Sequence, residues 1–395
     1  MPCRDRGPER TAPRDRAGGQ FNPTTRPDRP QCDFREARVT CRWPTLNAVC
    51  AATRIRQCPR SSPSNRCCTP GAFGGGSRST SVPTTRGFLF GLADCGAPVS
   101  LDPLGLMSPR HVALAALIGF TSPFVLLFGA GEVLSRPAVR PVGAPPPDLP
   151  ALGVRLHTAS GASVIGWFAR GQPGKGAVLL LHGVRADRTQ MLRRARFLNQ
   201  AGYAALLVDL PAHGESSGDR ITFGAREAAG VTAALEYLRH ELPGEHVGVI
   251  GVSLGAASTV LADPKPAPDA VILESMYPTI EEAVADRLVM RLGPVGASLV
   301  PPLLWQMSLR TGVHAQDLRP IQNLPRLGAP VLIVSGTEDK HTTWARTQRL
   351  FDSAVEPKEL WRVEGAAHVD LHAFQPEEYE RRTLRFLAKH LRNGA

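Results

Sequence analysis

Cysteine is absent from this chain beyond Cys95. The eight cysteines up to and including Cys95 lack the CxxC spacing of zinc and redox sites. The later part therefore carries no disulfide, and it is compatible with an oxidising or a reducing compartment. The sequence also has no HExxH, no GxxxxGK[ST], and no GxGxxG that opens a helix after the first strand. We therefore expect no metal, no organic cofactor and no nucleotide.

Lysine is absent from residues 1–106, as is any sustained hydrophobic periodicity. This segment has 16 arginines against 8 acidic residues, which accounts for +8 of the formal net charge of +11. The remainder is nearly neutral, so the high isoelectric point does not indicate a nucleic-acid partner. We predict that residues 1–106 are a disordered extension rather than a disulfide framework. Alternatively, translation begins at Met107 and this extension is a mis-called start.

Charge is absent from residues 112–131, a run of 20 residues, and about 20 are needed to cross a bilayer core of about 30 Å. Within residues 107–136 this run predicts a signal anchor and membrane attachment, with a cleaved signal peptide or a buried helix as alternatives. Arg110 precedes the run and Arg136 follows it, so the positive-inside rule does not fix the orientation. We expect an extracytoplasmic domain, with a cytoplasmic one as the alternative.

Residues 137–150 are rich in proline, which predicts an extended spacer and a domain boundary near residue 150. Over residues 151–395, short aliphatic runs alternate with longer helical patterns, as in α/β proteins with a largely parallel sheet. The predicted strands are 163–169, 177–181, 204–209, 247–252, 270–273, 331–335 and 360–363. The predicted helices are 189–200, 225–241, 254–262, 343–352 and 376–391. Residues 275–324 interrupt this alternation and predict a small cap insertion.

The segment Gly251-Val252-Ser253-Leu254-Gly255 is a GxSxG sequence between a predicted strand and a predicted helix. At such a turn the serine hydroxyl projects from the carboxyl end of the sheet, and the turn requires small flanking residues. The alternative is a glycine-rich turn without chemistry. We predict that Ser253 is a nucleophile and that the backbone NH of Leu254, at the start of the helix, faces an oxyanion.

Two later loops carry an acid and a base. Asp339 follows the strand 331–335, and His368 follows the strand 360–363 in a GxxH turn. A serine hydroxyl needs an imidazole to accept its proton and a carboxylate to hold that imidazole in the useful tautomer. Glu338 is the competing acid and Asp370 a more remote one, while an ordinary surface histidine is the alternative for His368.

The segment Leu181-His182-Gly183-Val184 lies at the end of the strand 177–181. With this segment the chain resembles the α/β-hydrolase superfamily. The resemblance covers about residues 152–391 and looks most like the esterase, dienelactone hydrolase and serine aminopeptidase-like group. It implies an α/β-hydrolase fold with a mostly parallel sheet between helices, and a second oxyanion NH from Val184. The side chain of His182 is expected only to shape the loop.

Residues 209–216 resemble the D-x-x-G-x-G-x-S loop of the same superfamily, with Ala212 in place of the first glycine. That turn is expected to differ locally, and Asp209 and His213 are expected to be structural or to line the entrance. In the cap, Met276, Tyr277, Val289, Met290, Leu303, Leu304, Trp305 and Met307 could line an acyl pocket, but packing within the cap is the more common role of such residues.

Membership of the superfamily implies acyl transfer to water through an acyl-serine intermediate on Ser253. A small-molecule carboxylic ester is the expected substrate class, as in carboxylesterases, with thioesters and amides next. The alternatives are a peptidase of the serine aminopeptidase-like type and an inactive membrane-tethered scaffold on the same fold. Against the scaffold, each triad position holds the required residue type. The sequence specifies neither the acyl length nor an oligomeric state.

Overall fold

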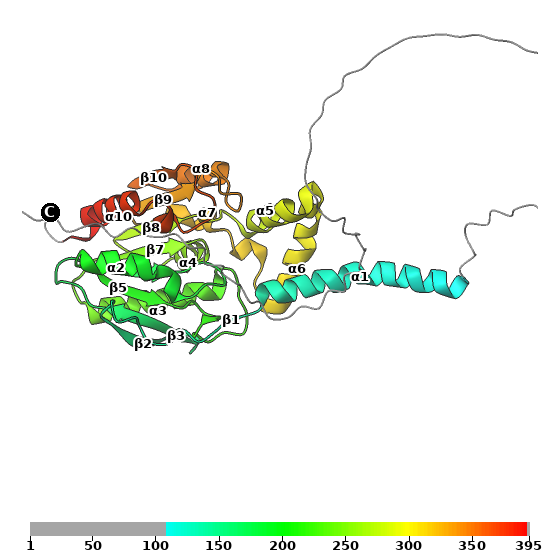
Figure 1. Ribbon diagram of the computed structural model, residues 1–395, viewed down its shortest axis with the longest axis horizontal. Helices are drawn as coiled ribbons and strands as arrows, with labels where there is room; N and C mark the ends of the chain where they lie inside the picture. Colours follow the sequence, from blue (N-terminus) through cyan, green and yellow to red (C-terminus); the bar gives the residue numbers. More distant parts are fainter. Residues whose placement is uncertain (1–107, 393–395) are drawn as a thin grey trace, which may run out of the picture. The chain divides into compact units, whose positions relative to one another are not determined.

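The computed structural model describes residues 108–392 (Figure 1). The disordered extension predicted for residues 1–106 lies outside the described residues. The centre is an eight-stranded sheet in the order β10-β9-β8-β7-β4-β5-β3-β2. Its strands are β2 (Ala151–His157), β3 (Ser163–Ala169), β4 (Ala177–Leu181), β5 (Ala204–Val208), β7 (Val247–Val252), β8 (Ala270–Glu274), β9 (Val331–Gly336) and β10 (Lys358–Val363).

Six neighbouring strands run parallel, in the sheet order β10-β9-β8-β7-β4-β5. The strand β3 pairs antiparallel with both β5 and β2. Parallel strands that are covered on both faces need apolar side chains throughout. All residues of β4, β5, β8 and β9 are buried, in agreement with their aliphatic sequences. The mostly parallel sheet that the resemblance implies is thereby confirmed.

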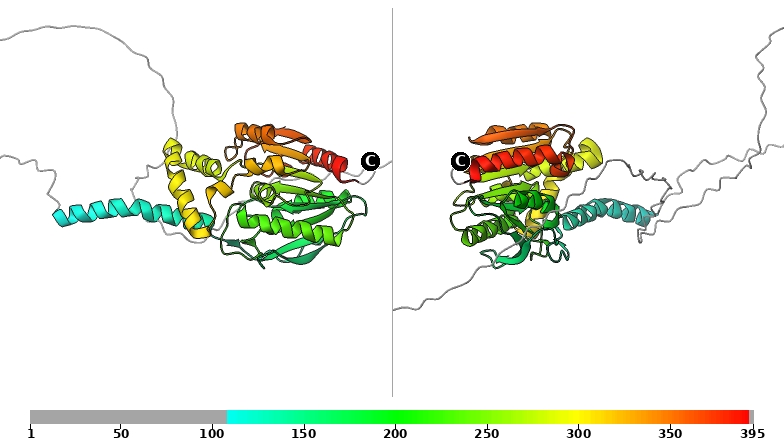
Figure 2. Two further views of the ribbon diagram at one scale, coloured as in Figure 1. Left: turned by 180° about the vertical axis from the view of Figure 1, so that it is seen from behind. Right: turned by 60° about the vertical axis from the view of Figure 1, so that its left-hand side comes forward.

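Helices cover both faces of this sheet (Figures 1 and 2). On one face α2 (Leu192–Gln200) and α10 (Pro376–Leu391) bury their apolar sides against alternate residues of β4, β5, β7 and β9. On the other face lie α3 (Ala225–Glu241), α4 (Leu254–Ala262) and α8 (Trp344–Ser353). The two layers fix the central strands, so the loops at the strands' carboxyl ends are held on a rigid base.

The predicted strands agree with the structure to within two residues at each end, and three of the five helices match at both ends. Between β4 and α2 the structure has a 3-10 turn, η1 (Arg188–Met191), where a continuous helix was predicted. Asp187 is the N-cap of this turn, and its carboxylate accepts a hydrogen bond from the Thr189 amide. The edge strand β2 was not predicted, because most of its side chains are exposed and do not alternate regularly.

The cap predicted over residues 275–324 lies between β8 and β9. It consists of α5 (Ile280–Leu292), η2 (Gly293–Leu299), α6 (Val300–Thr311), η3 (Ala315–Asp317) and α7 (Pro320–Asn323), and η4 (Leu324–Arg326) leads into β9. Of the eight residues considered for an acyl pocket, the buried ones are Met276, Tyr277, Leu303, Leu304 and Met307, and the exposed ones are Val289, Met290 and Trp305.

The apolar run 112–131 lies within helix α1 (Pro109–Ser135), which contains an 18-residue stretch with a mean hydropathy of 2.1. Among the described residues, two segments are long and apolar enough to cross a membrane by length and composition, namely Pro109–Ser135 and Ile280–Thr311. The first is a single helix with exposed side chains over most of its length. The second comprises α5, η2 and α6, so it is not one continuous helix.

The proline-rich segment 137–150 lies along the surface of the α/β unit. Its β1 (Ala138–Val139) pairs with β6 (His213–Gly214) in a small parallel sheet. The amides of Val142 and Gly143 donate to the Glu215 carboxylate, and Leu149 is buried in the core. The extended backbone expected here is therefore held by contacts with the domain.

Candidate active site

The predicted nucleophile Ser253 lies at the sharp turn between β7 and α4. Its backbone has φ 50° and ψ −102°, a left-handed value of φ that costs free energy for any residue with a Cβ. A Cβ at Gly251 would lie 2.6 Å from the Ala256 nitrogen, and one at Gly255 would lie 2.6 Å from the Leu181 oxygen. The two glycines therefore permit the turn. The Ser253 side chain makes no capping hydrogen bond to α4, so its hydroxyl is not used in the helix.

The predicted base and acid are hydrogen bonded to each other. His368 Nδ1 lies 2.7 Å from Asp339 Oδ2, and the Asp339 side chain is buried. The other carboxylate oxygen, Oδ1, accepts hydrogen bonds from the amides of His341 at 2.8 Å and Thr342 at 2.9 Å. Burial opposes ionisation of Asp339, but the hydrogen bond and charge of His368 together with the two amides keep its pKa below the usual value. Asp339 is therefore a fixed anion that orients His368.

The three predicted residues lie at one edge of the sheet. Ser253 follows β7, Asp339 follows β9 and His368 follows β10, and these strands are parallel. The Ser253 amide donates to the Glu274 carbonyl oxygen at the end of β8. Within the described chain, His368 and Asp339 are hydrogen bonded, whereas Ser253 and His368 are not. Such bonds often form only when substrate is bound.

The predicted oxyanion donors are backbone amides at the same edge. The Leu254 NH belongs to the first turn of α4, where amides have no partner within the helix. In the loop after β4, the Gly183 NH donates to Gln190 Oε1 at 2.7 Å, and the next amide along the chain is that of Val184. Gln190 therefore holds the Gly183 NH, which fixes the backbone next to the predicted donor Val184.

His182 has the structural role that its sequence position indicated. The ring is completely buried, with Nδ1 2.7 Å from the Gly183 oxygen and Nε2 accepting from the Leu210 NH at 3.0 Å. Burial, and the nearby ring of His213, lower the pKa of His182 to about 3. The imidazole is therefore neutral at physiological pH, and it joins the loop after β4 to the loop after β5.

A neutral buried histidine makes stability depend on pH. The unfolded chain binds a proton at the ordinary pKa of 6.5, whereas the folded chain resists it down to about 3, so stability falls as the pH is lowered through this window. We expect His182→Gln, whose amide oxygen can still accept from Leu210, to flatten the acid side of the stability profile by up to about 1 kcal/mol per pH unit. Urea unfolding between pH 7 and pH 4 measures this slope. The exposed His157→Gln is the control, and an equal slope in both variants would contradict the role of His182.

The loop 209–216 is structural as well. Asp209 forms a buried ion pair with Arg188 and accepts from the amides of Arg188 at 2.7 Å and Glu215 at 2.8 Å. Ala212 has φ 63°, a left-handed value that favours glycine, so the backbone at this position is strained by the alanine side chain. The His213 ring packs 5.1 Å from that of His182 and is buried. Asp209 and His213 thus support the loops behind the site.

Two residues near the predicted triad, His341 and Arg287, were not identified from the sequence. The His341 ring lies 4.8 Å from the His368 ring, and burial followed by the charges of Arg287 and His368 lowers the pKa of His341. Arg287 comes from the cap helix α5, is partly buried and donates to the Ala283 carbonyl oxygen at 2.8 Å. The position of His341 two residues after Asp339 was the only sequence signal, because the approach of Arg287 depends on how the cap folds over the site.

A buried ion-pair cluster beneath the site was also missed. Arg194 of α2 binds Glu274 through Nη2 at 2.7 Å and through Nε at 3.1 Å. Tyr379 of α10 bonds to both side chains, and Asp370 lies 2.9 Å from Arg194. Glu274 ends β8 and its carbonyl oxygen accepts from Ser253, while Asp370 follows His368 by two residues. Arg194 therefore connects β8, which bonds to the predicted nucleophile, to the loop of the predicted base.

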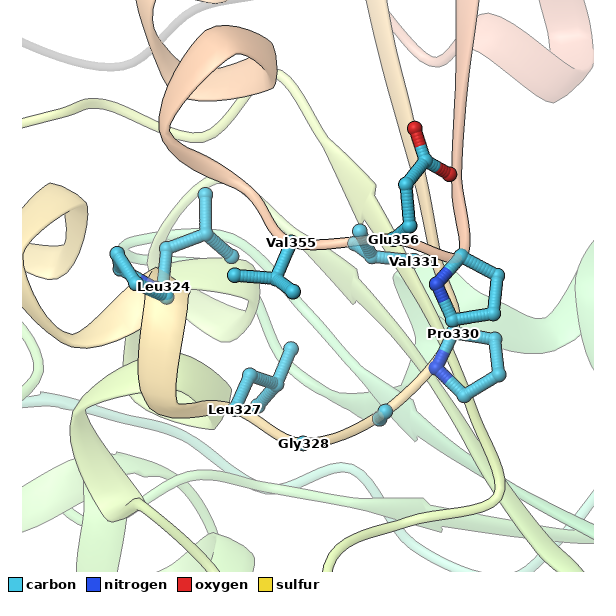
Figure 3. Close-up of a pocket in the computed structure, with 10 residues that line it drawn as sticks. Leu324, Leu327, Gly328, Pro330, Val331, Val355 and Glu356 are labelled. Atoms are coloured by element: carbon cyan, nitrogen blue, oxygen red, sulfur yellow. The ribbon is translucent and has the colours of Figure 1, made fainter.

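The hollow in Figure 3 is not part of this site. It has a volume of about 200 Å³ and is lined mainly by apolar residues, with Leu324, Leu327 and Val355 on one side. Pro330 and Pro357 directly precede β9 and β10, so the hollow lies at the amino ends of these strands. The predicted triad is at the carboxyl ends of the same strands.

Comparison with known proteins places this geometry in a family. Residues 178–382 match the alpha/beta hydrolase family, a range that begins in β4 and ends in α10. The chain is 28% identical over 276 residues to the uncharacterized protein Rv2307c of Mycobacterium tuberculosis, covering 68% of this chain and 91% of the relative. It is 23% identical over 238 residues to the uncharacterized protein YqkD of Bacillus subtilis, covering 59% of this chain and 77% of that protein.

Solved structures show the same fold. The esterase Pf2001 of Pyrococcus furiosus superposes with a TM-score of 0.54 at 24% identity, covering 64% of this chain and 98% of the esterase. The alpha/beta hydrolase GrgF of Penicillium sp. sh18 gives a TM-score of 0.50 at 20% identity, covering 62% of this chain and 99% of GrgF. The chain belongs to the alpha/beta hydrolase family.

Proposed function

We propose that this protein is a serine hydrolase that cleaves a carboxylic ester, with Ser253 as nucleophile, His368 as general base and Asp339 as the orienting acid. The observation that carries the proposal is the hydrogen bond of 2.7 Å between His368 Nδ1 and buried Asp339, at the sheet edge where Ser253 occupies its strained turn. In the neutral tautomer that carries its proton on Nδ1 in this bond, Nε2 is the nitrogen that can accept a proton.

In the proposed reaction, Ser253 Oγ attacks the ester carbonyl carbon as its proton passes to His368 Nε2. The amides of Leu254 and Val184 hold the developing oxyanion, and the positive end of α4 adds to this stabilisation. His368 then protonates the leaving alcohol, which yields an acyl-serine. A water molecule, deprotonated by His368, releases the carboxylic acid and restores Ser253.

Occupation of all three triad positions and the hydrogen-bonded acid and base favour an active enzyme over an inactive scaffold. Thioesters and amides share the same acyl chemistry, and a peptidase remains the second candidate. We further propose that α1 anchors the protein in a membrane, because its apolar length suits a bilayer core of about 30 Å. We propose an extracytoplasmic α/β domain, and a small-molecule acyl compound as the reaction partner.

A fluorophosphonate probe tests the nucleophile directly. The full-length chain is expected to be labelled, and Ser253→Ala is expected to lose the label together with hydrolysis of acyl esters, because no other group would carry the activated hydroxyl. Ser258→Ala, on the helix that follows the turn, is the matched control, since its hydroxyl is bonded to the Leu254 carbonyl oxygen at 2.7 Å. Equal labelling of the wild type and of Ser253→Ala would reject the proposal.

A further inference from the structure

The cap exposes six large apolar side chains on three elements that contact one another. These residues are Val289, Met290 and Leu292 of α5, Val295 of η2, and Trp305 and Leu309 of α6, with exposed fractions between 40% and 75%. Large apolar groups gathered on one exposed surface mark a site of interaction with a protein or a membrane. We call this set of six residues the cap face.

Helix α6 presents three different sides, which explains why part of it remains uncovered. Leu303, Leu304 and Met307 are buried toward the domain. Gln306 and Arg310 lie one turn apart and bind α1. Trp305 and Leu309 are also one turn apart, but about 100° around the helix from that pair, and they are 59% and 62% exposed. The free side of α6 therefore lies beside the side that holds α1.

Contacts between α1 and the cap are specific. Gln306 Nε2 donates to the Leu127 carbonyl oxygen at 2.8 Å, and Arg310 donates to the Phe128 carbonyl oxygen at 2.6 Å. Gly131 provides the space, because a Cβ there would lie 2.5 Å from the Gln306 side chain. Figures 1 and 2 show α6 crossing the C-terminal part of α1 at a steep angle.

The end of the apolar part of α1 is marked by Glu132. Its carboxylate pairs with Arg310 at 2.6 Å and with Arg220 at 2.7 Å, so this level of α1 lies in a polar environment. The cap face is next to the last turns of α1 before this ion pair. A bilayer that surrounds the preceding apolar turns would have its surface at the level of the cap.

The charge of the cap is suited to such a surface. From Arg287 to Gln316 the chain contains Arg287, Arg291 and Arg310, and no aspartate or glutamate. Arg291 lies on the exposed end of α5, next to Met290 and Leu292 in the sequence. Arginine beside exposed tryptophan and leucine is typical of helices that lie in the interface of anionic membranes.

We propose that the cap face inserts into the lipid headgroup region beside α1, so that the substrates are acyl esters of amphiphiles held in that membrane. This inference rests on the proposed hydrolase and anchor functions and adds the place from which the substrate arrives. The break at Gly293–Leu299 turns α5 and α6 away from a single spanning helix, so both can lie along the surface. Arg287, on α5 near His341 and Asp339, lies between the cap and the predicted site.

Trp305 provides a probe for this contact. The full-length chain is reconstituted into phosphatidylcholine and phosphatidylglycerol vesicles whose acyl chains are brominated near the headgroup, and tryptophan fluorescence is compared with that in unbrominated vesicles. We expect quenching that is largely lost in Trp305→Phe. The control is Trp344→Phe on α8, a partly buried tryptophan against Arg362, which should leave the quenching unchanged.

The outcomes separate the proposals. A chain that floats with the vesicles but shows no difference between the wild type and Trp305→Phe overturns the cap inference and retains the anchor. A chain that does not float overturns both, whereas fluorophosphonate labelling of Ser253 is unaffected by either result. In a second measurement, Trp305→Ser combined with Leu309→Ser should lower hydrolysis of a vesicle-embedded long-chain ester about tenfold and spare a short soluble ester. An equal loss on both esters would also contradict the cap inference.

Discussion

Replacement of Asp339 by asparagine is expected to lower kcat for ester hydrolysis by about 10⁴-fold while the chain stays folded. The reason is the tautomer of His368. Asp339 Oδ1 accepts the amides of His341 and Thr342, so the oxygen of an asparagine would be fixed on that side. Its NH₂ group would then face His368 Nδ1, which would have to accept a hydrogen bond and would leave the proton on Nε2. An imidazole protonated at Nε2 cannot accept the serine proton.

Glu338→Gln is the matched control for this prediction. Glu338 directly precedes Asp339 and was the competing acid, but it is exposed, and its amide donates to the Ala366 carbonyl oxygen. Steady-state kinetics on one soluble ester, with circular dichroism to verify folding, should show a large loss for Asp339→Asn and nearly wild-type activity for Glu338→Gln. The reverse order would assign the acid to Glu338.

Replacement of Arg194 by methionine is expected to lower the free energy of unfolding by about 3–5 kcal/mol, because the buried Glu274 carboxylate would lose its counter-ion. For a domain of this size this corresponds to a fall in Tm of roughly 10 °C. Arg196→Met is the control on the same helix. Its side chain is 36% exposed, and its pair with Asp148 should contribute less than about 1 kcal/mol.

A combined variant separates lost charge pairing from lost packing. Arg194→Met with Glu274→Leu and Tyr379→Phe removes all three buried polar groups together, so we expect it to recover most of the stability lost by Arg194→Met alone. Thermal and urea unfolding of the three proteins measure the difference. If the triple variant has a lower free energy of unfolding than Arg194→Met, this expectation is wrong. The remaining polar groups of the cluster would then stabilise the fold even without Arg194.

Much of the fold could be predicted because its central strands have a local signature. The sequences of β4, β5 and the first four residues of β9 are continuously aliphatic, which is typical of a covered parallel sheet. The strand β2 lacks such a pattern because it lies at the sheet edge with half-exposed residues. The short strand β1 was not visible either, since its pairing with β6 depends on a partner 75 residues away, as the Ala138 and His213 register shows.

For the candidate site, local motifs identified residues that lie on single loops. The contacts between residues of different loops and helices became visible only in the structure. The turn at Ser253 could be predicted because its glycines are adjacent in the sequence. Arg194, Glu274 and Tyr379 come from three distant segments, and no spacing rule connects them. The same holds for Arg287, which reaches the region of His368 only because the cap folds back.

Arg185 joins α1 to the loop of Val184, because its guanidinium donates to the carbonyl oxygens of Val133 and Arg136. Removal of α1 to obtain a soluble fragment would delete the Val133 acceptor and also Glu132, the partner of Arg220 and Arg310. Three arginines would lose partners at once, one of them a single residue from a proposed oxyanion amide. Kinetic constants of such a fragment would describe a chain with a relaxed Val184 loop, so the proposed anchor also supports the proposed oxyanion site.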